Sequence, residues 1–220
     1  NVTPDSFSDG GQHAHAQSAI AHAQQLVAEG ADIIDIGGES TRPGALPVSV
    51  QEELARVLPV IAALRESGVA ISVDTCKPEV MQAALEAGAD IINDVTGMRH
   101  PQAQRVIAAH PSCGVCLMHM QGEPRTMQSD PHYHNVVHEV KAELVAQAQL
   151  LEQLGVKSTR ISLDPGLGFG KTLEHNYQLL KGLAQLVQSG YPIVLGASRK
   201  SMIGAVTGKA VDQRLSGSIA

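Results

Sequence analysis

Short aliphatic runs alternate along the chain with longer amphipathic segments. The run Ile33-Ile34-Asp35-Ile36 is apolar at nearly every position, which is typical of a strand covered on both faces of a parallel sheet. Runs of this kind predict strands at residues 33–36, 71–73, 91–92, 115–118, 161–163 and 193–195. The periodicity between them predicts helices at residues 17–29, 50–67, 78–87, 101–109, 136–154 and 173–188. Prolines 78 and 101 stand where proline begins a helix, and glycines 88 and 155 where glycine ends one.

Strands and helices that alternate in this way predict a parallel sheet, either doubly wound or closed into a barrel. Polar residues follow nearly every strand, which favours the barrel, because the carboxyl ends of barrel strands converge on one mouth. Asn1-Val2-Thr3 resembles the end of an earlier strand, and the pattern stops part-way through a helix at Ala220. We therefore expect a single α/β domain over residues 1–220. We expect its fold to be a (β/α)₈ TIM barrel, with most of strand 1 and all of strand 8 missing from this chain.

Composition narrows the classes of partner. Hydrophobic residues make up 43% of the chain and aromatic residues 2%, so the core is expected to be aliphatic. The net charge of -6, without a basic cluster, argues against a nucleic-acid partner. No apolar stretch approaches the roughly 20 residues of a membrane span, and the three cysteines give no disulfide framework. We expect a cytoplasmic protein, with Cys116 as a small core residue and not half of a redox or zinc pair with Cys113.

The segment Gly37–Gly44 follows the first aliphatic strand and has the residues of an anion-binding loop. Paired glycines allow close backbone approach, Thr41 can donate a hydrogen bond, and Arg42 brings a permanent charge in a fork geometry. A plain helix-capping loop is the simpler alternative for this segment alone. The polar residues at the other strand ends favour the anion loop.

Two carboxylates and an amide, Asp74, Asn93 and Asp164, end three further strands. Together they match the donor-rich edge of an aminopyrimidinone, and Lys200 can donate to its carbonyl or a ring nitrogen. A divalent-metal site is the alternative for the aspartates, and spacing does not separate the two. A Schiff base on Lys200 is a less favoured alternative, because Ser198-Arg199-Lys200-Ser201 has the composition of an exposed turn.

Aromatic residues are scarce, yet Phe7 and Phe169 both fall in loops at the predicted mouth, where they can hold a flat second substrate. The segment Asp164–Lys171 has three glycines and a lysine but lacks the spacing of a phosphate-binding P-loop. We interpret it as a close-approach loop. His119, between two methionines, is expected to be a packed and hydrogen-bonded residue.

These motifs, taken together, resemble those of the dihydropteroate synthases of folate biosynthesis. The resemblance covers the whole chain and rests on the motifs just described, together with the segments 1–10, 72–75, 92–94, 117–122 and 198–201. It implies a transferase, usually a homodimer, that condenses 6-hydroxymethyl-7,8-dihydropterin pyrophosphate with p-aminobenzoate and uses Mg²⁺. Sulfonamides occupy the p-aminobenzoate site in that family.

The resemblance also implies a role for each matching residue. The pterin would be held by Asp74, Asn93, Asp164 and Lys200; pyrophosphate by Thr41 and Arg42; Mg²⁺ by Asn1; and p-aminobenzoate by Phe7, Pro43, Phe169 and Ser201. Thr41, Arg42 and Lys200 would serve catalysis. The alternatives are a pterin-binding methyltransferase domain and a non-catalytic pterin-binding module.

Overall fold

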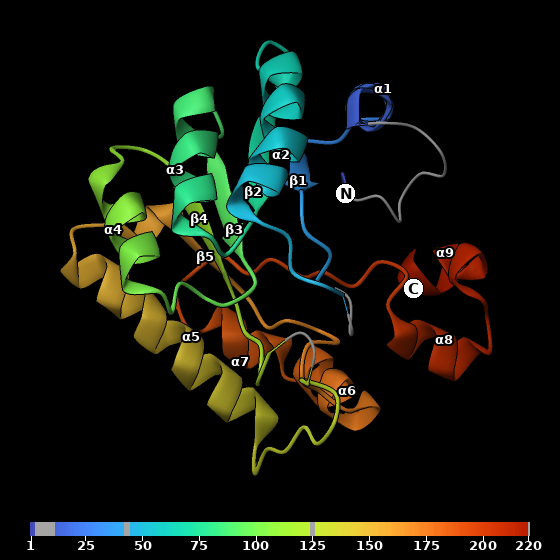
Figure 1. The fold of residues 1–220 in the computed structure, drawn as a ribbon. Coiled ribbons are helices and arrows are strands. Elements are labelled where there is room, and N and C mark those ends of the chain that lie inside the picture. Colours follow the sequence, from blue (N-terminus) through green and yellow to red (C-terminus); the bar gives the residue numbers. More distant parts are fainter. Residues whose placement is uncertain (3–11, 42–44, 124–125, 220) are drawn as a thin grey trace.

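A parallel sheet with helices on its outer side forms the frame of the protein (Figure 1). The computed structural model describes residues 1–2, 12–41, 45–123 and 126–219. Its strands are β1 (Ile33–Gly37), β2 (Ala70–Asp74), β3 (Ile91–Asp94), β4 (Gly114–Met118) and β5 (Ile161–Asp164). They pair in chain order, β1-β2-β3-β4-β5, and every pair is parallel. A doubly wound sheet would reverse its order at a switch point, so this is the wall of a TIM barrel, as predicted.

Backbone contacts continue the sheet past both of these edge strands. Beside β1, the N–H of Val2 donates to the carbonyl of Gly37 (2.8 Å). Beyond β5, Leu163 accepts from Val194 and donates to Pro192 (2.9 Å each). The strand predicted at residues 193–195 is wrong, because the segment makes a single bridge, between Leu163 and Ile193. Pro192 has no N–H to extend the ladder, and Val194 is 44% exposed, unlike the buried strands before it.

The helices between the strands follow the predicted order and lie on the outer side of the sheet, whereas α8 and α9 stand apart from it near the C-terminus (Figure 1). They are α1 (Gln12–Ala28), α2 (Val50–Leu64), α3 (Pro78–Ala87), α4 (Pro101–Ala109), α5 (Val136–Gln153), α6 (Leu173–Lys181), α7 (Leu183–Val187), α8 (Ser201–Thr207) and α9 (Leu215–Ile219). The helix predicted at residues 173–188 is divided at Gly182. A Cβ there would lie 2.7 Å from Val137 on α5, so the glycine lets the two segments approach closely.

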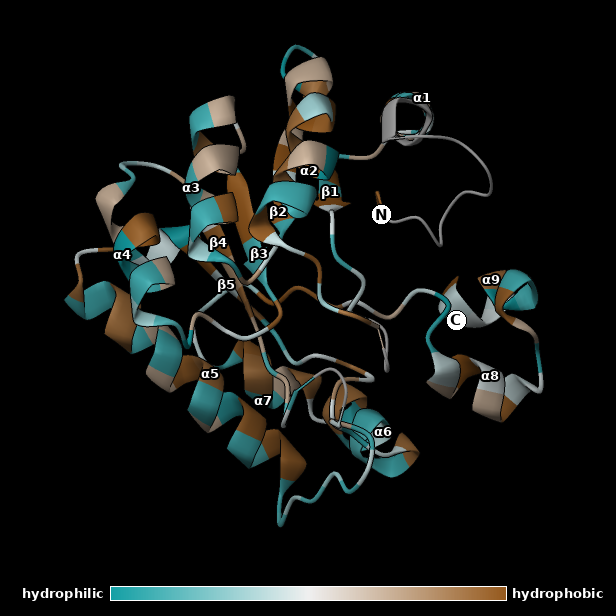
Figure 2. Ribbon diagram, viewed as in Figure 1, coloured by the Kyte–Doolittle hydropathy of each residue, from teal (hydrophilic) through white to brown (hydrophobic). Residues whose placement is uncertain are grey.

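Aliphatic side chains fill the space between the sheet and the helices, as the composition predicts. Ile61, Ile92 and Leu117 are fully buried members of this core, and Figure 2 shows hydrophobic and hydrophilic stripes alternating along α2 and α5. The three cysteines are free, and Cys116 is buried in β4, which confirms it as a small core residue. Within the described ranges, no helix is both long and apolar enough to cross a membrane.

Candidate active site

Polar side chains gather where the strands end, and the strand register places them side by side. Gly37 pairs with Asp74, and Asp74 pairs with Asn93, so these residues lie in one row across β1, β2 and β3. The Asn93 amide donates to the Asp35 carboxylate (3.1 Å). Asp35 was not among the predicted site residues, although it lies inside the first predicted strand. It extends the row of acceptors by one carboxylate.

Burial and mutual repulsion act on these carboxyl groups. Burial raises the pKa of Asp74 well above its usual range, and the charges of Asp35, Asp94 and Glu53 raise it further. Burial also raises the pKa of Asp164, against a hydrogen bond from the Gly166 N–H (2.7 Å). Such a row of acceptors is stabilised by a ligand that brings hydrogen-bond donors or positive charge.

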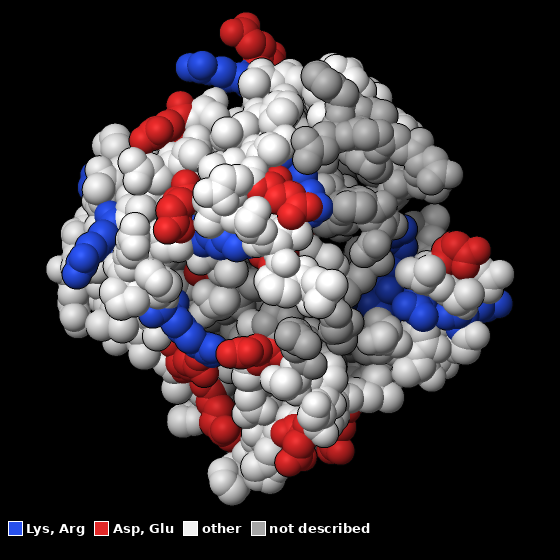
Figure 3. All heavy atoms as spheres, in the orientation of Figure 1, with Lys and Arg blue, Asp and Glu red and all other residues white. Residues whose placement is uncertain are grey.

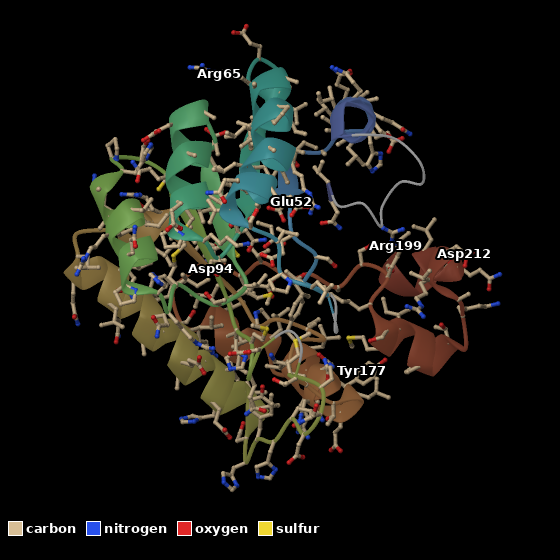
Figure 4. The ribbon with its side chains drawn as sticks, viewed as in Figure 1. Glu52, Arg65, Asp94, Tyr177, Arg199 and Asp212 are labelled. Carbon is tan, nitrogen blue, oxygen red and sulfur yellow. The ribbon has the colours of Figure 1, made fainter. Side chains whose placement is uncertain are left out.

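Asp94, next to Asn93, has a structural role. Its carboxylate accepts from the backbone and hydroxyl of Thr96 (2.7 Å each) and from the Met98 N–H (2.9 Å). Met98 has a positive φ of 58°. Asp94 therefore holds the turn after β3, and it lies near the centre of the molecule in Figure 4.

Asn1 faces Asp74 across Gly37. A Cβ at Gly37 would lie 3.1 Å from the Asn1 Oδ1 and 3.6 Å from an Asp74 carboxylate oxygen. These are hard oxygen donors, which suit Mg²⁺. Within the described part of the chain, no three His, Cys, Asp or Glu side chains gather as a metal site. A metal ion beside Asn1 would thus need water or substrate oxygens to complete its shell, as Mg²⁺ commonly does.

A cavity of about 930 Å³ opens beside this row of carboxylates. Five predicted site residues line it: Asn1, Thr41, Phe169, Lys200 and Ser201. Asp74, Asn93 and Asp164 are not among its lining residues. Lys200 lies between the two parts of the site, since it lines the cavity and is close enough to Asp164 to feel its charge. Burial lowers the pKa of Lys200, and the charge of Asp164 opposes that change. The remaining predicted residues, Phe7, Arg42 and Pro43, lie outside the described residues.

Phe169 and Lys200 form one wall of this cavity. The Lys200 ammonium lies 4.6 Å from the centroid of the Phe169 ring, within the range of a cation–π contact. Ser201 begins α8 directly after Lys200. On α6, Tyr177 projects toward α8, where its hydroxyl donates to the Met202 carbonyl (3.1 Å; Figure 4). The Phe169 ring, the Lys200 ammonium and the Ser201 side chain thus line the same cavity.

The glycine-rich segment after β5 approaches the end of β4 closely, which confirms its interpretation as a close-approach loop. Gly166 has a φ of 66°, and a Cβ there would overlap the His119 carbonyl oxygen. Gly170 has a φ of 62°, and a Cβ there would lie 2.9 Å from the Cβ of Gln121. Only glycine fits both the backbone conformation and the space.

An ion-pair network holds the base of the loop that carries Thr41. Lys77 pairs with both Glu39, in the loop, and Glu53, on α2. Arg56 donates to the Gly38 carbonyl (2.7 Å), and Glu39 accepts from the Val48 N–H (3.1 Å). The loop is thereby fixed to α2 and to the start of α3.

Positive charge gathers at one side of the cavity despite the negative net charge of the chain. Figure 3 shows basic side chains over the α8–α9 region. Arg199 lines the cavity, and the Arg214 guanidinium donates to the carbonyls of Arg199 (3.0 Å) and Lys209 (3.1 Å). The site therefore presents cations on the α8 side and carboxylates at the strand ends.

Known proteins share this arrangement. The family model described as "Pterin binding enzyme" matches residues 1–220. The dihydropteroate synthase of Escherichia coli (strain K12) is 51% identical over 221 residues, which cover 100% of this chain and 78% of that protein. The chain belongs to the dihydropteroate synthase family. The Xanthomonas albilineans dihydropteroate synthase, solved with 4-aminobenzoic acid, has a TM-score of 0.92 and 49% identity, covering 100% of this chain and 78% of that one. Its structure in complex with 7,8-dihydropteroate has a TM-score of 0.88 and 46% identity, with the same coverage.

This dihydropteroate synthase family member also has site residues that sequence reasoning missed. Gln128 and Asn176 line the cavity, and both hydrogen-bond the backbone of Gly168, at 2.5 and 2.8 Å. Neither residue stands in a pattern that indicates a site. His119 is buried and bonded to Lys171 and Glu143, which confirms it as a packed residue.

Proposed function

We propose that this protein condenses 6-hydroxymethyl-7,8-dihydropterin pyrophosphate with p-aminobenzoate to give 7,8-dihydropteroate and pyrophosphate. The observation that carries the proposal is the cavity itself. It brings Thr41, Phe169, Lys200 and Ser201 together beside carboxyl groups whose pKa values are raised by burial. Membership of the dihydropteroate synthase family supports the same reaction.

The pterin would bind at the strand ends. Its amino group and ring N–H are donors, and Asp74, Asn93 and Asp164 supply acceptors in one neighbourhood. Because burial, and then repulsion by Asp35 and Asp94, raises the pKa of Asp74, a pterin that develops positive charge would stabilise the charged carboxylate. The carboxylates would therefore bind the transition state more tightly than the neutral substrate.

The arylamine would lie against the other part of the site. Phe169 offers an apolar face, and Lys200 and Ser201 offer a cation and a hydroxyl for the p-aminobenzoate carboxylate. Phe7 and Pro43 are proposed to complete this site. Sulfonamides, which resemble p-aminobenzoate in shape and polarity, would compete with it here.

Thr41 and Arg42 would hold the pyrophosphate on the anion-binding loop. Asn1 would coordinate Mg²⁺ together with pyrophosphate oxygens, which agrees with the oxygen donors beside Gly37. The ion would neutralise part of the negative charge on the departing pyrophosphate. Basic residues on the α8 side, including Arg199, add to the local positive potential.

The reaction then needs no protein nucleophile. The C–O bond to pyrophosphate breaks with its electron pair on the leaving oxygen, and the pterin retains a delocalised positive charge. The arylamine nitrogen attacks the exocyclic carbon, forms the C–N bond and loses a proton to solvent. The protein contributes by positioning both substrates and by stabilising charge as it separates.

Product formation tests the proposal directly. Mixing both substrates with Mg²⁺ should release pyrophosphate and give 7,8-dihydropteroate, and Asp74→Asn should abolish pterin binding measured by calorimetry. Binding of the pterin without pyrophosphate release would instead identify a non-catalytic module. Pterin binding that does not depend on the pyrophosphate group would favour a methyltransferase domain.

A homodimeric state and a cytoplasmic location are proposed from the resemblance. Light scattering of the purified protein and fractionation of expressing cells test each one. A monomeric mass would refute the first, and recovery outside the cytoplasmic fraction would refute the second.

A further inference from the structure

Three consecutive carbonyls in the loop after β5 each accept a hydrogen bond from a side chain. The Gly168 carbonyl accepts from Gln128 (2.5 Å), the Phe169 carbonyl from Lys171 (2.9 Å), and the Gly170 carbonyl from Tyr133 (2.8 Å). Three glycines with positive φ give this loop little rigidity of its own. Side chains from outside the loop and from its end therefore fix its shape.

Lys171 differs from the other two because it is charged and only 3% exposed. Its amino group lies 3.0 Å from the His119 Nδ1, 3.2 Å from the His119 carbonyl and 2.9 Å from the Phe169 carbonyl. Three acceptors match the three protons of an ammonium group. The lysine thereby joins the Phe169 loop to the end of β4.

The partner of the His119 Nε2 determines which of the two ring nitrogens carries the proton. Its Nε2 lies 3.2 Å from Glu143, which also pairs with Arg99 at 2.5 Å. The hydrogen bond from His119 lowers the pKa of Glu143 to about 2, so this carboxylate is charged and accepts the Nε2 proton. A neutral His119 then presents the Nδ1 lone pair to Lys171. Burial lowers the pKa of Lys171 to about 7, and the nearby charges of Asp164 and Glu143 oppose that change.

We propose that Lys171 is a positioning residue for the arylamine site, which clamps the backbone of Phe169 to the end of β4 through the Glu143–His119–Lys171 chain. The expected effect on the KM for p-aminobenzoate rests on the proposed function. Lys171 also lines the cavity, and the ring of Phe169 meets Lys200 at 4.6 Å. A displaced Phe169 backbone would misplace both the aromatic face and the Lys200 ammonium.

Lys171→Met tests the clamp, and Arg160→Met is its matched control. Arg160 is also a cation tied to two backbone carbonyls, those of Cys113 (2.7 Å) and Ile107 (3.1 Å), but it directly precedes β5, at the opposite end of the strand. Loss of hydrogen bonds to a charged group should raise the KM for p-aminobenzoate about 10-fold in Lys171→Met. The kcat and the KM for the pterin pyrophosphate should change less than about 3-fold, and Arg160→Met should leave both KM values unchanged.

Hydrogen exchange gives a second readout that does not depend on activity. Amides of residues 166–171 should exchange faster in Lys171→Met than in the wild type, and Arg160→Met should leave them unchanged. If the wild type is inactive but Lys171→Met still exchanges faster than the wild type, the clamp is supported and the proposed function is rejected. Unchanged exchange and an unchanged KM for p-aminobenzoate would overturn the clamp. If Lys171→Met does not fold, Glu143→Gln, which weakens the other end of the Glu143–His119–Lys171 chain, must raise the same KM or the proposal fails.

Discussion

Lys77 holds two glutamates of different exposure, and removing it should destabilise the protein strongly. The Glu53 side chain is 0% exposed and that of Glu39 is 20% exposed. Among the described residues, the Glu53 Oε1 has no hydrogen-bond partner, so its other oxygen depends on Lys77. Burial acts to lower the pKa of Lys77, but hydrogen bonds to both glutamates outweigh it, and the pKa of Lys77 is raised. Lys77 is therefore charged at neutral pH.

Lys77→Met leaves the Glu53 carboxylate buried without its cation. Breaking a buried pair in this way costs about 3–5 kcal/mol. The double variant Lys77→Met/Glu53→Leu replaces the pair with apolar groups beside Val57, and such replacements are commonly near neutral. We expect the double variant to regain most of the loss, with a coupling free energy of about 2–4 kcal/mol.

Urea denaturation at pH 7 measures these free energies, with Lys181→Met on the exposed end of α6 as control. The control should lie within about 0.5 kcal/mol of the wild type. The KM for the pterin pyrophosphate should rise in both Lys77→Met and the double variant, because both lose the link to Glu39 at the base of the Thr41 loop. A Lys77→Met loss below about 1 kcal/mol, or additive losses in the double variant, would refute the reasoning.

Three further changes test other parts of the site. Asp74→Asn should raise the Tm at pH 7.5 while abolishing turnover. Folding raises the pKa of Asp74, so the folded state binds more protons and loses stability as the pH rises above the pKa of the unfolded chain. A lowered Tm would contradict this. Gly166→Ala should destabilise by several kcal/mol in urea, whereas Gly155→Ala, also at positive φ but with open space around it, should lose about 1 kcal/mol; equal losses would refute the close approach. Because burial lowers the pKa of Lys171 from 10.5 to about 7, the unfolded chain binds more protons between these values. The free energy of unfolding of the wild type should therefore rise by about 2 kcal/mol from pH 7 to pH 9 relative to Lys171→Met, and a difference that does not change with pH would reject the shift.

The sequence predicts the sheet well because its strands are short, continuous and aliphatic. Prediction fails at residues 193–195, where an apolar run follows Pro192 and makes only one bridge. It fails again at Gly182, where the helical period continues but close packing against Val137 divides the helix. The failure at Gly182 comes from a tertiary contact that no local pattern records, whereas Pro192 is a signal that the sequence itself carries against a strand.

The site could be predicted where its residues stand at strand ends. Asp74, Asn93 and Asp164 follow buried runs, and topology alone brings such residues together. Glu143 could not be found in this way, because it lies in the middle of α5 and acts on the site through His119. The link from Lys77 to Glu39 likewise depends on how α3 packs against the loop after β1.

The order of the strands in the sheet follows their order in the chain. Each strand pairs with the next one, as Ile33 does with Ala70, so each pairing closes the loop of one βα unit. The cavity instead joins Asn1 to Val211, which are separated by nearly the whole chain. A ligand that touches both sides of the cavity therefore stabilises the contacts of greatest sequence separation, which are the most expensive in chain entropy to form.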